Sequence, residues 1–142
     1  ELLYRSGAGL TPRPLRRIAS GGELSRVMLA SKVVLGNADG VDTLVFDEVD
    51  AGVGGSTARA LASVLADLAA THQVLVVTHL AQVAVIADKH YVVSKEPGDV
   101  PQTHLDEVTG DARTAEIARM LSGDQSEASL AHAKQMLEEA RS

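Results

Sequence analysis

The feature that most constrains the fold is a pair of short apolar segments with a helical pattern between them. The first segment runs from Thr43 to Phe46 and the second from Val74 to Val77. A strand, a helix and a strand in this order predict a parallel sheet with a right-handed crossover. A third strand, His90 to Ser94, is expected to follow. The predicted fold class is therefore α/β with a parallel sheet. The intervening helix is expected to be capped by Ser56 and to bury Ala58, Leu61, Ala62, Leu65 and Leu68.

The other segments predict smaller elements around that sheet. A helix from Ser20 to Leu35 is expected to end at the glycines of residues 36–40. Its apolar stripe is expected to be Leu24, Val27, Met28 and Val34. The remaining expected elements are a strand end at Leu2 to Tyr4, a loop at Ser6 to Pro14, a glycine-rich loop at Ala51 to Gly55, a short helix at Leu80 to Ala87, an edge strand at Thr103 to Val108, and closing helices at Ala112 to Leu121 and Glu127 to Ala140.

Composition excludes several classes of protein. The 142 residues carry 13 basic and 19 acidic side chains, a net charge of −6, which excludes a simple basic DNA-coating domain. Cysteine is absent, so there is no disulfide framework, thiol catalysis or cysteine-ligated metal. Aromatic residues make up 2%, too few for a module that stacks bases on aromatic rings. Charge is uneven, because residues 1–38 hold six basic and two acidic side chains.

Two adjacent carboxylates, Asp47 and Glu48, end the first predicted strand. In open α/β sheets, ligands bind beyond the carboxyl ends of the strands. An Asp there suits Mg²⁺, and the adjacent Glu suits a general base that positions water. His79 follows the second strand and could polarise an attacking water. The alternative is that Asp47 and Glu48 are ordinary charged residues at a strand end and that His79 is structural.

The segment Ser20-Gly21-Gly22-Glu23 has the form of a capping box at a helix N-terminus. Its two glycines leave amides exposed, and the helix dipole there favours an anion. The segment therefore predicts either an anion site or an ordinary capped helix. Arg13, Arg16 and Arg17 likewise predict either phosphate or DNA contacts or a solvated loop. No glycine-rich phosphate loop of the Gly-x-x-x-x-Gly-Lys type occurs in the sequence.

Taken in order, these motifs resemble the ABC-type ATPases. The segment "SGGELSR" resembles their signature motif, "TLVFDE" their Walker B strand, "AGVGG" their D-loop, and His79 their switch histidine. Five longer segments are similar to the C-terminal part of the RecN family, bacterial SMC-like DNA repair ATPases. They are "ASGGELSRVMLA", "LVFDEVDAGVGG", "VTHLAQVA", "EIARMLSG" and "SLAHAKQML". The resemblance covers nearly the whole chain.

The resemblance implies a P-loop NTPase-like head whose phosphate loop, Walker A, lies in an N-terminal lobe beyond a coiled coil. This would explain both the missing loop and the first residue being Glu1. The chain would be one lobe, residues 1–142. It would comprise an initial strand and loop (1–19), the signature helix, Walker B, D-loop and switch-histidine strands (20–94), and an edge strand with closing helices (95–142).

By the same resemblance, Asp47 would hold Mg²⁺ through water, Glu48 would activate the hydrolytic water and His79 would sense the γ-phosphate. The signature residues Ser20, Gly21, Gly22 and Glu23 would bind ATP held by a second head. The implied cofactors are ATP and Mg²⁺, and the implied partners are the N-terminal lobe, a second head in a homodimer, and DNA. The isolated chain is expected to be inactive, and the protein to act in the bacterial cytoplasm at the nucleoid.

One departure concerns the D-loop, where many relatives of the wider class carry Asp and this chain has Gly54. Asp50 is a candidate substitute for a contact across the dimer. Two other functions remain open: the nucleotide-binding subunit of an ABC transporter, and a non-catalytic module that retains only the fold.

Overall fold

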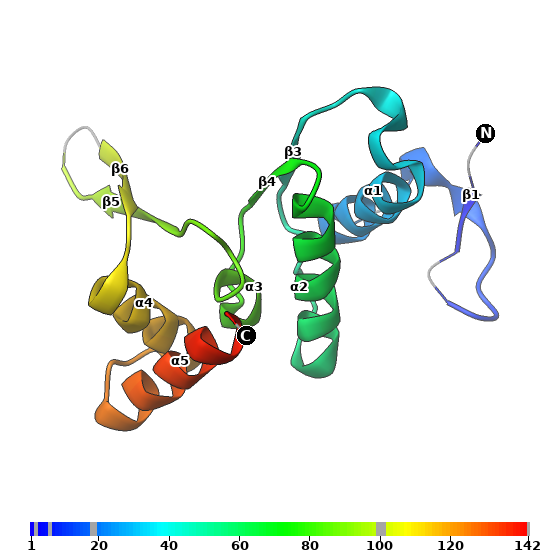
Figure 1. Cartoon of the computed structure of the whole chain (residues 1–142). Coiled ribbons are helices and arrows are strands. Elements are labelled where there is room, and N and C mark those ends of the chain that lie inside the picture. The colour runs from blue at the N-terminus through cyan, green and yellow to red at the C-terminus, as the bar shows by residue number, and fades with distance from the viewer. Residues whose placement is uncertain (2, 6, 18–19, 99–101, 142) are drawn as a thin grey trace. The chain divides into compact units, whose positions relative to one another are not determined.

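The computed structural model describes residues 1, 3–5, 7–17, 20–98 and 102–141. The described chain forms two compact units, residues 1–78 and residues 79–142 (Figure 1). In the described ranges, no helix is long and apolar enough to cross a membrane.

The first unit begins with a two-residue hairpin and a long helix. Strand β1 (Leu3–Tyr4) pairs antiparallel with β2 (Arg13–Pro14), and the 3-10 helix η1 (Leu15–Arg17) follows. Helix α1 (Gly21–Leu35) begins where the Ser20 hydroxyl accepts a hydrogen bond from the Glu23 amide at 3.5 Å, as a capping residue does. The helix ends at Gly36, whose φ of 55° favours glycine, and 3-10 helix η2 (Gly36–Asp39) follows.

A parallel strand pair and one helix make the core of this unit. Strand β3 (Thr43–Phe46) pairs in parallel with β4 (Gln73–Val76), and helix α2 (Gly55–Ala69) connects them. Leu44 and Phe46 of β3 are buried. Helix α2 buries all five residues that its spacing predicted: Ala58, Leu61, Ala62, Leu65 and Leu68.

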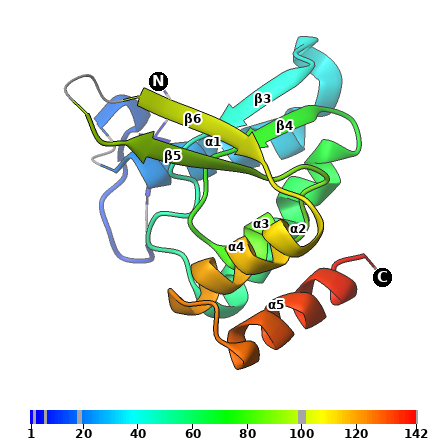
Figure 2. The same ribbon diagram turned by 90° about the vertical axis from the view of Figure 1, so that its left-hand side faces the viewer.

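The second unit combines a hairpin with packed helices. Helix α3 (Ala81–Ala84) contacts helix α4 (Gly110–Ser122), which packs along helix α5 (Glu127–Glu139) (Figure 2). Ile117, Ala118 and Ala133 are fully buried in this core. Arg113 of α4 donates from Nη2 to three carbonyls at and just beyond the end of α3, those of Ala84, Val85 and Ala87, at 3.1, 3.2 and 2.6 Å.

The third strand differs from the sequence prediction. Strand β5 (Tyr91–Glu96) pairs antiparallel with β6 (Gln102–Glu107) along its whole length. The predicted extension of the parallel sheet by His90 to Ser94 is therefore wrong for the described residues. Strands β5 and β6 are separated by only a short stretch of sequence, which favours their local pairing as an antiparallel hairpin, and the prediction did not allow for this competing partner.

Local details of three other predictions are also wrong. Gly54, not Ser56, occupies the N-cap of α2, and no side chain caps that helix. The predicted loop at Ser6 to Pro14 contains strand β2. The stripe predicted for α1 does not face the core, because Leu24, Met28 and Val34 are exposed and Leu29 is buried. The helix is apolar around most of its circumference, so spacing alone could not select its buried face.

Candidate functional site

The chain turns sharply at the end of β3, and this turn separates two exposed carboxylates from one buried one. Asp47 and Glu48 are exposed, whereas Val49 and Asp50 are 0% and 2% exposed. The amide of Ala51 donates to the Glu48 carbonyl at 3.0 Å, which closes the turn. Glu48 has a φ of 56°, a left-handed conformation that is uncommon for residues other than glycine.

Side chains of helix α1 hold the backbone of this turn. The hydroxyl of Ser25 donates to the carbonyl of Asp47 at 2.6 Å. Nη1 of Arg26 donates to the carbonyls of Val49 and Ala51 at 3.2 and 2.9 Å. These bonds satisfy backbone groups that the turn leaves outside the sheet, so the segment carrying the two exposed carboxylates has a fixed backbone.

The glycines at the start of α1 lie against the same turn. A methyl group added to Gly21 would collide with a carboxylate oxygen of Glu48. One added to buried Gly22 would lie 2.8 Å from both the Glu48 carbonyl oxygen and the Ala51 Cβ. The structure therefore brings the Ser20–Glu23 segment and Glu48 together within one chain. Sequence reasoning did not foresee this contact.

The end of β4 is tied to the buried carboxylate. The Val77 amide donates to the Phe46 carbonyl at 2.9 Å, which continues the pairing of β4 with β3. Next, the Thr78 hydroxyl donates to Asp50 Oδ2 at 2.5 Å. The burial of Asp50 does not fit the role of a carboxylate that reaches a second head. His79 is exposed and is the first residue of the second unit.

The carboxylate of Asp47 is the group that could take a metal ion here. Within the described ranges, no three His, Cys, Asp or Glu side chains form a metal-binding group. Mg²⁺ is commonly held by one or two carboxylates together with substrate phosphates and water. An exposed Asp47 on a fixed backbone fits such a shared site.

The three arginines near the N-terminus belong to the short elements that precede helix α1. Arg13 belongs to β2, and Arg16 and Arg17 belong to η1; all three are exposed. Nε of Arg16 is 3.1 Å from a carboxylate oxygen of Glu1. Exposure is compatible with both alternatives, a solvated loop and a phosphate or DNA contact.

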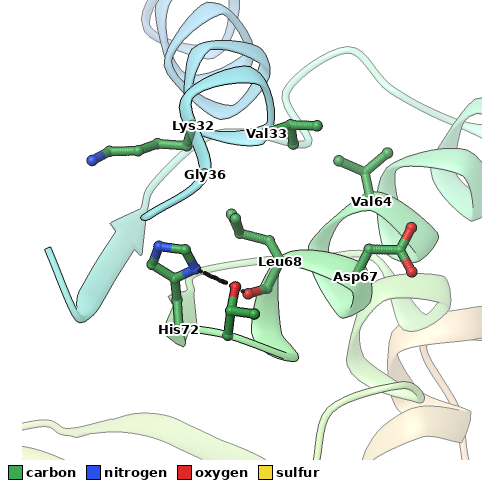
Figure 3. Close-up of a pocket in the computed structure, with 8 residues that line it drawn as sticks. Lys32, Val33, Gly36, Val64, Asp67, Leu68 and His72 are labelled. Atoms are coloured by element: carbon green, nitrogen blue, oxygen red, sulfur yellow. Dashed lines mark hydrogen bonds between the residues drawn. The ribbon is translucent and has the colours of Figure 1, made fainter. Parts of the chain in front are cut away.

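A hollow of about 230 Å³ lies elsewhere in the first unit, between the C-terminal halves of α1 and α2 (Figure 3). Residues lining it include Lys32, Asp67 and His72. Nδ1 of His72 is 2.9 Å from the Thr71 hydroxyl. None of the predicted site residues lines this hollow, so it is separate from the candidate site.

Comparison with known proteins identifies close relatives of the chain. It is 52% identical over 139 residues to the DNA repair protein RecN of Treponema pallidum, and 55% identical over 137 residues to that of Deinococcus radiodurans. Each match covers 96% of this chain and 24% of the relative. RecN of Mycobacterium tuberculosis is 50% identical over 146 residues, a match that covers 99% of this chain and 24% of that protein. The resemblance to RecN is confirmed, and the chain spans about a quarter of the length of these relatives.

No family model matches the chain. A solved structure from work on the "structural biochemistry of ATP-driven dimerization and DNA stimulated activation of SMC ATPases" shares its fold, with a TM-score of 0.52 and 21% identity. The match covers 95% of this chain and 69% of the solved chain. The predicted α/β class is thus confirmed, with a parallel sheet of two strands in the described residues, and the chain shares the fold of that solved structure.

Proposed function

We propose that this chain is the C-terminal lobe of an ATPase head in a DNA repair protein. The support is its similarity to about a quarter of the length of RecN proteins. ATP binding closes two such heads and hydrolysis reopens them. This cycle drives DNA binding or bridging during recombinational double-strand-break repair. The lobe comprises residues 1–142, and it is inactive until it is joined to a lobe that carries the phosphate loop.

The observation that carries the proposal is the arrangement around the turn after β3. Asp47 and Glu48 are exposed at the carboxyl end of a parallel strand, and Gly21 at the start of α1 lies against Glu48. In open α/β sheets this edge binds ligands, and a helix N-terminus favours anions. The RecN relationship supports assigning this edge to ATP.

The proposed roles are those that the resemblance to the ABC-type ATPases implies for these residues. Glu48 accepts a proton from the attacking water or orients it, and His79 donates a hydrogen bond to the γ-phosphate. Ser20, Gly21 and Gly22 present a hydroxyl and helix-terminal amides to the ATP of a second head. Glu23, whose amide donates to the Ser20 hydroxyl, completes this segment. Phosphoryl transfer requires mainly positioning and charge stabilisation, which these groups supply.

The proposed cofactors are ATP and Mg²⁺. When bound, Mg²⁺ neutralises charge that develops on the phosphate oxygens. Asp47 would hold the metal through water. The hydrogen bond from Ser25 to the Asp47 carbonyl fixes the backbone of this residue while its carboxylate stays exposed.

The proposed partners include the phosphate-loop lobe of the same protein. One face of the β3–β4 pair displays Val45, Leu75 and Val77, which are 67%, 49% and 61% exposed. A parallel sheet is usually covered on both faces, so this open face suits a further layer. The other partners are a second head and DNA, at the nucleoid of a bacterial cytoplasm.

The test is Mg²⁺-dependent ATP hydrolysis and nucleotide-dependent dimerisation of the whole protein, beside its Glu48→Gln variant. The parent should hydrolyse ATP slowly, and the variant should lose hydrolysis and accumulate an ATP-bound dimer. Glu127→Gln, an exposed change in the first turn of α5, is the matched control and should behave as the parent does. A parent without hydrolysis, together with a Glu48→Gln variant that forms no dimer, would contradict the proposal.

A further inference from the structure

The strand pair β3–β4 is extended by one side-chain bond beyond its backbone pairing. The backbone bond from Val77 to Phe46 is the last of the ladder, at 2.9 Å. One residue further, the Thr78 hydroxyl donates to the Asp50 carboxylate. This bond joins the end of β4 to the turn after β3 at the edge where Glu48 is exposed.

Asp50 is built into that turn. Its relative exposure is 2%, and the carbonyls on either side of it, those of Val49 and Ala51, both accept from Arg26. The Asp50 carbonyl itself accepts from the amide of Val53 at 3.0 Å. A buried carboxylate is costly unless it is hydrogen-bonded, and the Thr78 hydroxyl is one of its donors, so loss of this donor should weaken the hold on this part of the turn.

We propose that Asp50 and Thr78 are positioning residues for ATP hydrolysis. Glu48 lies two residues before Asp50, and His79 follows Thr78 by one peptide bond. Within the first unit, the hydrogen bond therefore ties the end of β4 to the turn that carries the proposed water-activating carboxylate. It holds the backbone of that turn in place, and Asp50 and Thr78 themselves do not contact the nucleotide. This inference rests on the proposed function.

A positioning role and a merely structural role predict different kinetics. If the bond only stabilises the fold, its loss lowers the amount of active protein and the melting temperature without a specific change in turnover. If it positions the reacting groups, its loss lowers kcat and leaves KM for ATP nearly unchanged, because ATP is bound mainly by other groups. Misplacement of a reacting group by about 1 Å can cost roughly a hundredfold in rate.

The experiment uses the whole protein with Thr78→Val, Thr78→Ala and Thr78→Ser. Thr78→Val should lower kcat about tenfold or more and change KM less than about twofold. Thr78→Ala should do the same, and it avoids a methyl group against Asp50 if the valine variant folds poorly. Thr78→Ser keeps the hydroxyl and should restore kcat to within about twofold of the parent.

Thr43→Val is the matched control. The Thr43 hydroxyl donates to Gln73 Oε1 at 3.0 Å, so it is also a threonine side-chain bond, at the opposite end of the same strand pair. This variant should keep the parental kcat. Parental kcat in Thr78→Val and Thr78→Ala would overturn the inference, as would equal losses in Thr78→Ser and Thr43→Val. A parent that does not hydrolyse ATP would overturn the proposed function as well, so the two failures are distinguishable.

Discussion

Gly21 and Gly22 are neighbours, yet an alanine at each position should have a different effect. At Gly21 the added methyl group would meet the carboxylate end of Glu48, a flexible side chain that can move away. At Gly22 it would lie 2.8 Å from the Glu48 carbonyl oxygen and 3.1 Å from Nη1 of Arg26. That carbonyl accepts the Ala51 amide, so it cannot move without opening the turn.

The magnitude follows from two opposing effects. Overpacking a well-packed site costs about 1–3 kcal/mol, and replacing glycine by alanine inside a helix returns up to about 1 kcal/mol. With an overpacking cost of about 2 kcal/mol, the middle of that range, and a helix gain of about 1 kcal/mol, Gly22→Ala should destabilise the turn by about 1 kcal/mol. Gly21→Ala should leave the turn as stable as in the parent, or slightly more stable. It should instead lower ATP hydrolysis, because it displaces the Glu48 carboxylate.

Hydrogen–deuterium exchange of the whole protein measures this difference locally. The amides of Ala51 and Val53 are hydrogen-bonded within the turn and report its opening. A loss of about 1 kcal/mol corresponds to roughly fivefold faster exchange at these amides, since 1.4 kcal/mol is a factor of ten. Unchanged exchange in Gly22→Ala, or faster exchange in Gly21→Ala than in Gly22→Ala, would refute the reasoning.

Three further predictions concern other parts of the chain. Ser20→Arg should block ATP-dependent dimerisation while ATP binding persists, measured by light scattering and nucleotide titration; loss of both together would contradict a role in trans. Hydrogen bonds from Ser129 and Ser126 lower the pKa of Asp124 to about 2. These bonds to the ionised carboxylate therefore stabilise the folded protein fully above about pH 4, and this stabilisation is lost as the pH falls toward 2. The melting temperature of Asp124→Asn should accordingly converge on that of the parent over that range, and a constant difference would contradict this. Arg113→Ala removes the donor to three carbonyls at and just beyond the end of α3 and should destabilise the second unit by about 2–3 kcal/mol. Amide exchange in α3 and α4 should become faster, and parental exchange there would show that water replaces the guanidinium.

Local sequence patterns predicted the elements that local forces determine. The span of α1, its Ser20 cap and the bounds of β3 all follow from neighbours within a few residues. The buried face of α2 was also predictable, because its apolar residues form one stripe with polar and small residues elsewhere. Helix α1 offered no such contrast, and the prediction of its buried face was wrong.

The candidate site was predictable only in its exposed part. Asp47, Glu48 and Asp50 are acidic residues within four positions, and no periodic pattern distinguishes the exposed pair from the buried one. That difference arises from contacts with Arg26 and Thr78, which are 24 and 28 positions away from Asp50. Ser25 and Arg26 were part of the quoted signature motif, but their role as donors to the turn depends on tertiary structure.

The open face of the β3–β4 pair explains another difference between sequence and structure. The runs Thr43 to Phe46 and Val74 to Val77 predict strands that are buried on both faces, since alternation with polar residues is weak. The structure buries Leu44 and Phe46 on one face and leaves Val45 and Val77 mostly exposed on the other. A strand is apolar on both sides when a layer of structure covers each face of its sheet. The described part of the first unit covers one face of the β3–β4 pair and leaves the other exposed. Under the proposed function, the second layer belongs to the phosphate-loop lobe, so the same residues that made the strands recognisable would also form the contact that completes the ATP site.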